Sequence, residues 1–99
     1  MSAHYLTIDG MLSGTGIRES VVGGYLEPNE LGVSPTLMEN ITAWLRRYEY
    51  AHYNQFENAD QNMELDREGI AICKLIQKEL PESRIEYFSS ALMRKIPWQ

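Results

Sequence analysis

The stretch "SPTLMENITAWLRRYEYAHYNQF", from Ser34 to Phe56, decides the fold. Ser34 is a good N-cap and Pro35 suits the first helical position, so a helix is expected to begin here. Apolar side chains then recur at helical spacing, at Leu37, Ile41, Trp44, Leu45, Tyr48 and Ala51. At about 100° per residue these positions cover about one third of a helical wheel. The sequence therefore predicts an amphipathic helix that reaches about Phe56.

A second helix is expected after a polar break. The break is "ENADQN", from Glu57 to Asn62, where Asn, Asp and Glu indicate a connection. The second helix then runs from about Met63 to Leu80 and is stopped by Pro81. Its apolar side consists of Leu65, Gly69, Ile72, Cys73, Ile76 and Leu80. We expect the two helices to be antiparallel.

Extended segments flank this helix pair. "HYLTID" carries alternating aromatic and β-branched residues, which predicts a strand from Ala3 to Ile8. A helical turn is expected at Asn29 to Leu31, "RIEYF" predicts a closing strand, and "LMRKI" is a further extended piece. A short second strand is expected to include Val21, Val22, Tyr25 and Leu26. The prediction is an α+β fold with two antiparallel helices packed on one face of a small β-sheet.

Length and composition indicate an ordinary globular protein. A chain of 99 residues, 43% hydrophobic and 23% charged, is expected to form one domain over residues 1–99. It shows no signal-peptide pattern and no apolar run of about 20 residues, so we expect a cytoplasmic protein that does not enter a membrane. The net charge of −5 argues against direct nucleic-acid binding and favours a partner with a basic surface.

The glycine-rich stretch "GTGIRESVVGG", from Gly14 to Gly24, resembles a phosphate-binding loop only in part. A strand precedes it, but "SVVGG" does not predict the helix N-terminus that would hold an anion, and Glu19 would repel a phosphate. A small-ligand or nucleotide-binding enzyme domain that uses the loop from Gly14 to Arg18 is therefore the alternative function. Arg18 itself either binds a partner's carboxylate or forms an internal ion pair with Glu19 or another acid.

Residues that carry catalysis or bind metals do not form a recognisable set. Cys73 is the single cysteine and lies on the apolar side of the second helix, where it is expected to act as a small hydrophobe. His52 has no His, Asp or Glu four residues away on its helix, and Ser89 and Ser90 have no identifiable base. We expect a protein that is not an enzyme and needs no cofactor or metal.

Surface residues of the first helix suggest protein binding instead. Arg46, Tyr50 and Tyr53 follow an i, i+4, i+7 spacing and are expected to project away from the apolar face. Tyrosine and arginine are over-represented among residues that carry interface energy. The alternative is that the C-terminal "MRKIPWQ" covers the two tyrosines.

An acidic segment follows the first helix. Its acids, opposed only by Arg67, are Glu57, Asp60, Glu64, Asp66 and Glu68. Such a run is either a solvated helix start or a surface that meets a basic partner, where it would accelerate encounter.

Three segments carry a family resemblance. "GTGIRES", "GGYLE" and "WLRRYEYAHYNQF", within Ser13 to Phe56, resemble the small immunity proteins of bacterial polymorphic-toxin and contact-dependent growth-inhibition systems. The resemblance implies a non-catalytic protein that binds one cognate toxin domain, often a nuclease, and blocks it inside the producing cell. Our hypothesis is that it does so by occluding the toxin's active site. A homo-oligomeric structural protein that self-associates through its tyrosines or strand edges, and dimerisation of an inhibitor, both stay open.

Overall fold

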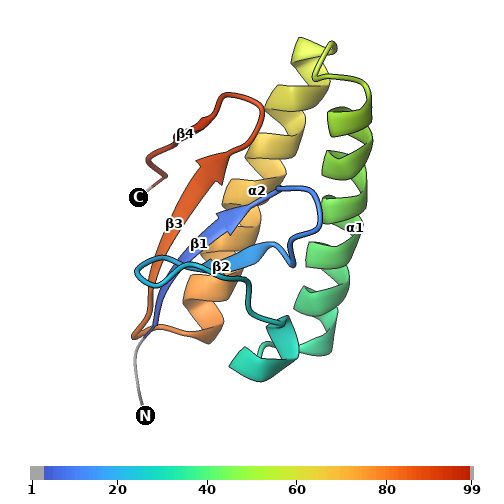
Figure 1. Ribbon diagram of the computed structural model, residues 1–99. Coiled ribbons are helices and arrows are strands. Elements are labelled where there is room, and N and C mark those ends of the chain that lie inside the picture. Colours follow the sequence, from blue (N-terminus) through green and yellow to red (C-terminus); the bar gives the residue numbers. More distant parts are fainter. Residues whose placement is uncertain (1–3, 99) are drawn as a thin grey trace.

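The computed structural model describes residues 4–98 and has the expected α+β architecture (Figure 1). The elements along the chain are β1 (Tyr5–Asp9), β2 (Ile17–Glu19), the 3₁₀ turn η1 (Pro28–Leu31), α1 (Pro35–Tyr53), α2 (Ala59–Glu79), β3 (Arg84–Ser89) and β4 (Arg94–Lys95). The strand predicted from Ala3 is confirmed from Tyr5 onward, and Ala3 lies outside the described residues. The helical turn before α1 and the extended segments near the C-terminus are confirmed as well.

The sheet has the strand order β2-β1-β3-β4. The central strands β1 and β3 are parallel, with Leu6 opposite Ile85, whereas β2 and β4 pair antiparallel to them. A parallel pair needs a crossover connection, and α1 and α2 together provide it on one face of the sheet (Figure 1). The apolar side of each helix and the facing strand residues form the core: Leu6, Ile8, Ile17, Val33, Leu37, Ile41, Trp44, Tyr48, Ala51, Leu65, Ile72, Cys73, Ile76, Ile85 and Tyr87.

Helix α1 begins as the sequence predicts. The Ser34 hydroxyl accepts a hydrogen bond from the Leu37 amide at 3.2 Å, and Pro35 occupies the first turn. The helix ends at Tyr53, three residues before the expected end, because Gln55 and Phe56 both adopt a left-handed backbone with φ of 55° and 54°. This conformation disfavours side chains that carry a Cβ.

Gln55→Gly is therefore expected to raise the free energy of unfolding by about 0.5–1 kcal/mol, because glycine removes the steric cost at this position. The Gln55 side chain is exposed, so little contact is lost. Urea unfolding measures the change. Glu49→Gly, at an exposed position inside α1, is the control and should lower stability by about 1 kcal/mol. If both variants lost the same free energy of unfolding, the backbone of Gln55 would not be strained.

Helix α2 begins earlier than expected. Its first residue is Ala59 rather than Met63, because the Asn58 carboxamide caps the helix by accepting a hydrogen bond from the Gln61 amide at 3.0 Å. The polar segment that the sequence indicates as a connection is thus largely the first turn of α2 itself. Asparagine and aspartate favour this position as strongly as they favour loops, so composition alone does not separate the two.

The second strand lies earlier in the chain than the sequence predicts. It lies at Ile17–Glu19, and Val21 and Val22 are exposed in a turn. The Glu19 carboxylate accepts hydrogen bonds from both valine amides, at 3.1 and 2.6 Å, and the Glu19 amide bonds the Gly24 carbonyl at 2.9 Å. Val21 and Val22 therefore lie at the tip of a hairpin-like turn. The hydrogen bonds from their amides to Glu19 stabilise this turn more than their β-branched side chains favour a strand.

Candidate partner-binding surface

The predicted tyrosine and arginine face of α1 is exposed. Tyr50 and Tyr53 expose 63% and 73% of their surface, and Arg46 is exposed one turn before Tyr50. As far as Trp98, the last described residue, the C-terminal segment does not cover them, because β4 pairs with β3 at the opposite edge of the sheet from β2 and lies away from α1 (Figure 1). Tyr50 and Tyr53 are therefore available to another molecule.

The acids around the α1–α2 connection differ in their surroundings. Glu57 and Asp60 are exposed at the end of the helix pair, whereas Glu64 bonds Arg67 at 2.7 Å and Glu68 pairs with Arg47 of α1. Arg47 brings Glu68 against the same helix that carries the tyrosines. We call the exposed residues of this region, together with the half-buried Glu68, the helix-end surface: Arg46, Tyr50, Tyr53, Glu57, Asp60, Glu64 and Glu68.

Asp66 does not belong to the helix-end surface. The prediction that it lies in an exposed acidic segment is wrong. It is only 7% exposed. Its carboxylate accepts hydrogen bonds from the hydroxyls of Tyr48 at 2.7 Å, Tyr87 at 2.6 Å and Ser89 at 2.7 Å. Burial raises the pKa of both tyrosines, so each phenol keeps the proton that it donates. Asp66 thus connects α1, α2 and β3 inside the core.

The position of Asp66 in the sequence indicates that it is buried, although a count of charges does not. Asp66 precedes Gly69 by three residues and Cys73 by seven, so it lies on the apolar side of α2. An acid on the buried side of a helix requires internal donors. Gly69 contributes as well, because a Cβ there would overlap the Tyr87 ring that reaches Asp66.

Arg18 forms the internal ion pair that was one of its two expected roles, but with Asp9 rather than Glu19. Its Nε donates to Asp9 Oδ2 at 3.0 Å, and the Tyr25 hydroxyl donates to Oδ1 at 2.9 Å. Asp9 is fully buried, and burial beside this carboxylate raises the pKa of Tyr25. The glycine stretch leads into β2 instead of a helix, so the structure offers no helix N-terminus to an anion there.

Arg18→Ala is expected to lower the free energy of unfolding by about 1–3 kcal/mol, because the Asp9 carboxylate would stay buried without its cationic partner. The half-exposed guanidinium keeps this figure below that of a fully buried pair. Chemical denaturation measures it, with Arg67→Ala as the control, since Arg67 pairs with Glu64 on the surface. An equally stable Arg18→Ala variant would contradict a structural role for Arg18.

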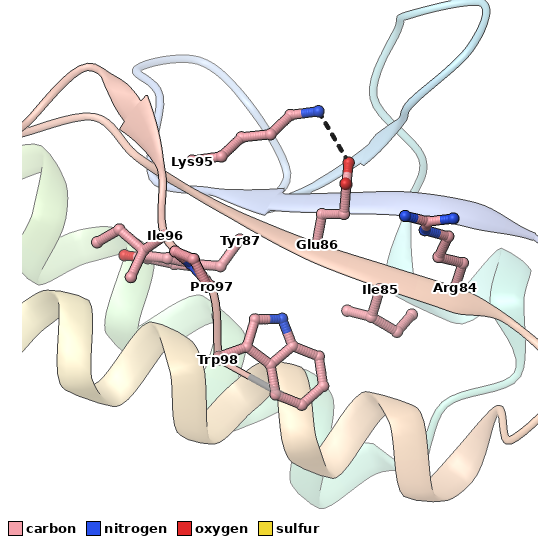
Figure 2. A pocket seen from close by; sticks show the side chains of 8 residues that line it. All are labelled: Arg84, Ile85, Glu86, Tyr87, Lys95, Ile96, Pro97 and Trp98. Atoms are coloured by element: carbon pink, nitrogen blue, oxygen red, sulfur yellow. Dashed lines mark ion pairs between the residues drawn. The ribbon is translucent and has the colours of Figure 1, made fainter.

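A separate pocket of about 300 Å³ lies between β3 and the C-terminal segment (Figure 2). Its lining residues are Arg84, Ile85, Glu86, Tyr87, Lys95, Ile96, Pro97 and Trp98. Lys95 Nζ lies 3.0 Å from Glu86 Oε1, and both side chains lie on one side of the sheet while Ile85 and Trp98 lie on the other (Figure 2). Residue patterns give no sign of this pocket, because the pocket depends on where the chain leaves the sheet after Lys95.

The sequence matches a known protein family over most of its length. The model of the family described as Serratia CdiI immunity protein-like matches residues 13–90. The chain belongs to this family. The match extends the resemblance seen in the first half of the sequence through α2 and β3, and it includes both helices and the whole helix-end surface. No match was found among curated proteins or among solved structures.

Membership of this family identifies the chain as an immunity protein of contact-dependent growth inhibition, whose role is to neutralise a toxin. Such a role requires a surface that recognises another protein. Within residues 4–98, neither helix is long and apolar enough to cross a membrane.

Proposed function

We propose that this immunity protein binds its cognate toxin domain through the helix-end surface and covers the toxin's active site. The observation that carries the proposal is the exposure of Tyr50 and Tyr53 next to acids at one end of the helix pair. Tyrosines provide large, rigid contact area, and residues of this type dominate measured interface energies. Arg46 supplies a bidentate donor one turn away.

The charge of the surface favours a toxin with a basic active site, such as a nuclease. Glu57 and Asp60 have no ion-pair partner among residues 4–98, and the whole chain carries a net charge of −5. A nuclease must attract a polyanion, so its active site presents cations to which these acids are complementary. The acids would then mainly accelerate association.

Neutralisation by occlusion needs no catalytic group in the immunity protein, and we propose that the chain is not an enzyme. Protection of the producing cell further implies that it acts in the cytoplasm, where a nuclease would find its substrate. The family match supports the immunity role, and the charge pattern supports the choice of partner.

Co-expression with the product of the neighbouring reading frame tests the proposal. That product alone should stop growth, and growth should recover when this protein is present. Recovery should weaken for a variant that carries Glu57→Lys and Asp60→Lys. The unmodified protein should associate with the purified toxin domain more slowly as salt is raised. A harmless neighbouring product, or one that stays toxic beside this protein, would contradict the proposed role.

A further inference from the structure

The outer edge of β3 is only partly paired. β3 pairs with β1 along its length, from Arg84 opposite Tyr5 to Phe88 opposite Asp9. On its other side β4 pairs only with Phe88 and Ser89, and one further hydrogen bond joins the Ile96 amide to the Tyr87 carbonyl at 3.0 Å. The first half of β3 thus has a strand on one side only.

The backbone of Ile85 is the unpaired point of this edge. Successive residues of a strand direct their N–H and C=O groups to opposite neighbours. Arg84 donates to the His4 carbonyl beside β1 at 2.7 Å, whereas the Tyr87 carbonyl faces β4, so Ile85 also faces the β4 side. β4 does not extend opposite Ile85, and among residues 4–98 no bond from a turn or loop reaches its N–H or C=O, although the residue is only 1% exposed. Backbone groups shielded from water in this way favour a partner.

The C-terminal segment does not supply that partner. Continuing the β3–β4 register, in which Phe88 faces Lys95, would place Trp98 opposite Ile85. The chain instead leaves the sheet at Ile96 and Pro97, and no hydrogen bond joins Trp98 to Ile85. The pocket of about 300 Å³ occupies the space between them, and Figure 2 shows the segment forming its far wall.

We propose that this edge of β3 accepts an extended segment of the toxin, which pairs with the N–H and C=O of Ile85 and with the N–H of Tyr87, where a longer β4 would lie. The inference rests on the proposed function, because it assigns the segment to the toxin. Exposed sheet edges bind extended chains through main-chain hydrogen bonds, and side chains on the two sides of the edge give specificity.

The two sides of the edge define the segment that fits. Side chains on the Trp98 side meet an apolar surface formed with Ile85, whereas those on the opposite side meet Arg84 and the Lys95–Glu86 ion pair. Arg84 contributes a positive charge there without an acidic partner among residues 4–98. The fitting segment therefore alternates apolar residues with polar or acidic ones.

Amide hydrogen exchange of the isotope-labelled protein, measured by NMR with and without the unlabelled toxin domain, tests the inference on the unmodified chain. The Ile85 and Tyr87 amides should exchange at least tenfold more slowly in the complex. Glu86 and Phe88 are the matched controls, because their amides face β1 and should change little.

The outcomes separate this inference from the proposed function. A complex that forms but leaves the exchange of Ile85 and Tyr87 unchanged would overturn edge pairing and leave the immunity role intact. Slower exchange that appears on concentrating the protein alone would assign the edge to a second copy of this chain and overturn the toxin segment. Failure of any complex to form would overturn both.

Discussion

Asp66→Ala is expected to lower the free energy of unfolding by about 3–5 kcal/mol, a large part of the stability of a domain of this size. The change leaves the hydroxyls of Tyr48, Tyr87 and Ser89 buried without their shared acceptor. Each unpaired buried hydroxyl costs about 1–3 kcal/mol, and some relaxation into the space left by the carboxylate reduces the sum. Urea unfolding followed by circular dichroism measures the loss.

Glu64→Ala is the matched control for this prediction. Glu64 lies two residues earlier on the same helix, but it is exposed and pairs only with Arg67, so its removal should change stability by less than about 0.5 kcal/mol. Asp66→Asn should cost less than Asp66→Ala, because one oxygen still accepts from the tyrosines. A stability loss at Asp66→Ala no larger than that at Glu64→Ala would show that the buried network does not hold the helices to the sheet.

The double substitution Tyr50→Ala and Tyr53→Ala is expected to weaken toxin binding at least about 30-fold while leaving the fold intact. The two rings project into solvent from α1, so their truncation removes no core contact. A loss of this size corresponds to about 2 kcal/mol, which is typical of residues that dominate an interface. Titration calorimetry with the purified toxin domain measures the affinity, and urea unfolding confirms stability.

Leu75→Ala serves as the control for the tyrosine variant. Leu75 is also a partly exposed apolar residue on a helix, but it lies in the second half of α2, away from the α1–α2 connection. Its truncation should leave toxin affinity within about twofold of the original. Equal losses for both variants would place the contact on another part of the helix pair, and an unchanged affinity for the double variant would exclude the helix-end surface.

The sequence predicts the helices and the fold class because the signals for them are local. Ser34 with Pro35 starts α1, and the apolar positions from Leu37 to Ala51 continue it, whatever the rest of the chain does. The second strand could not be placed in the same way. Val21 and Val22 have the stronger strand preference, but the Glu19 carboxylate bonds their amides in a turn, and β2 forms where Ile17 can enter the core.

The sequence predicts the candidate site only for residues whose exposure can be read from their position around a helix. Tyr50 and Tyr53 lie opposite the apolar side of α1, so their exposure could be expected from the sequence. Asp66 could not be separated from the neighbouring acids by a charge count, because its donors come from residues about 20 positions away. The open edge at Ile85 depends on the point at which the chain leaves the sheet, and residue preferences do not specify it.

The most direct test of the central claim is the activity of the purified toxin domain under titration with this protein. Occlusion of the active site predicts that activity falls to background in proportion to the complex formed, and that the Tyr50→Ala and Tyr53→Ala variant requires at least about 30-fold higher concentrations for the same inhibition. A saturated complex that keeps full activity on a small substrate would contradict the account.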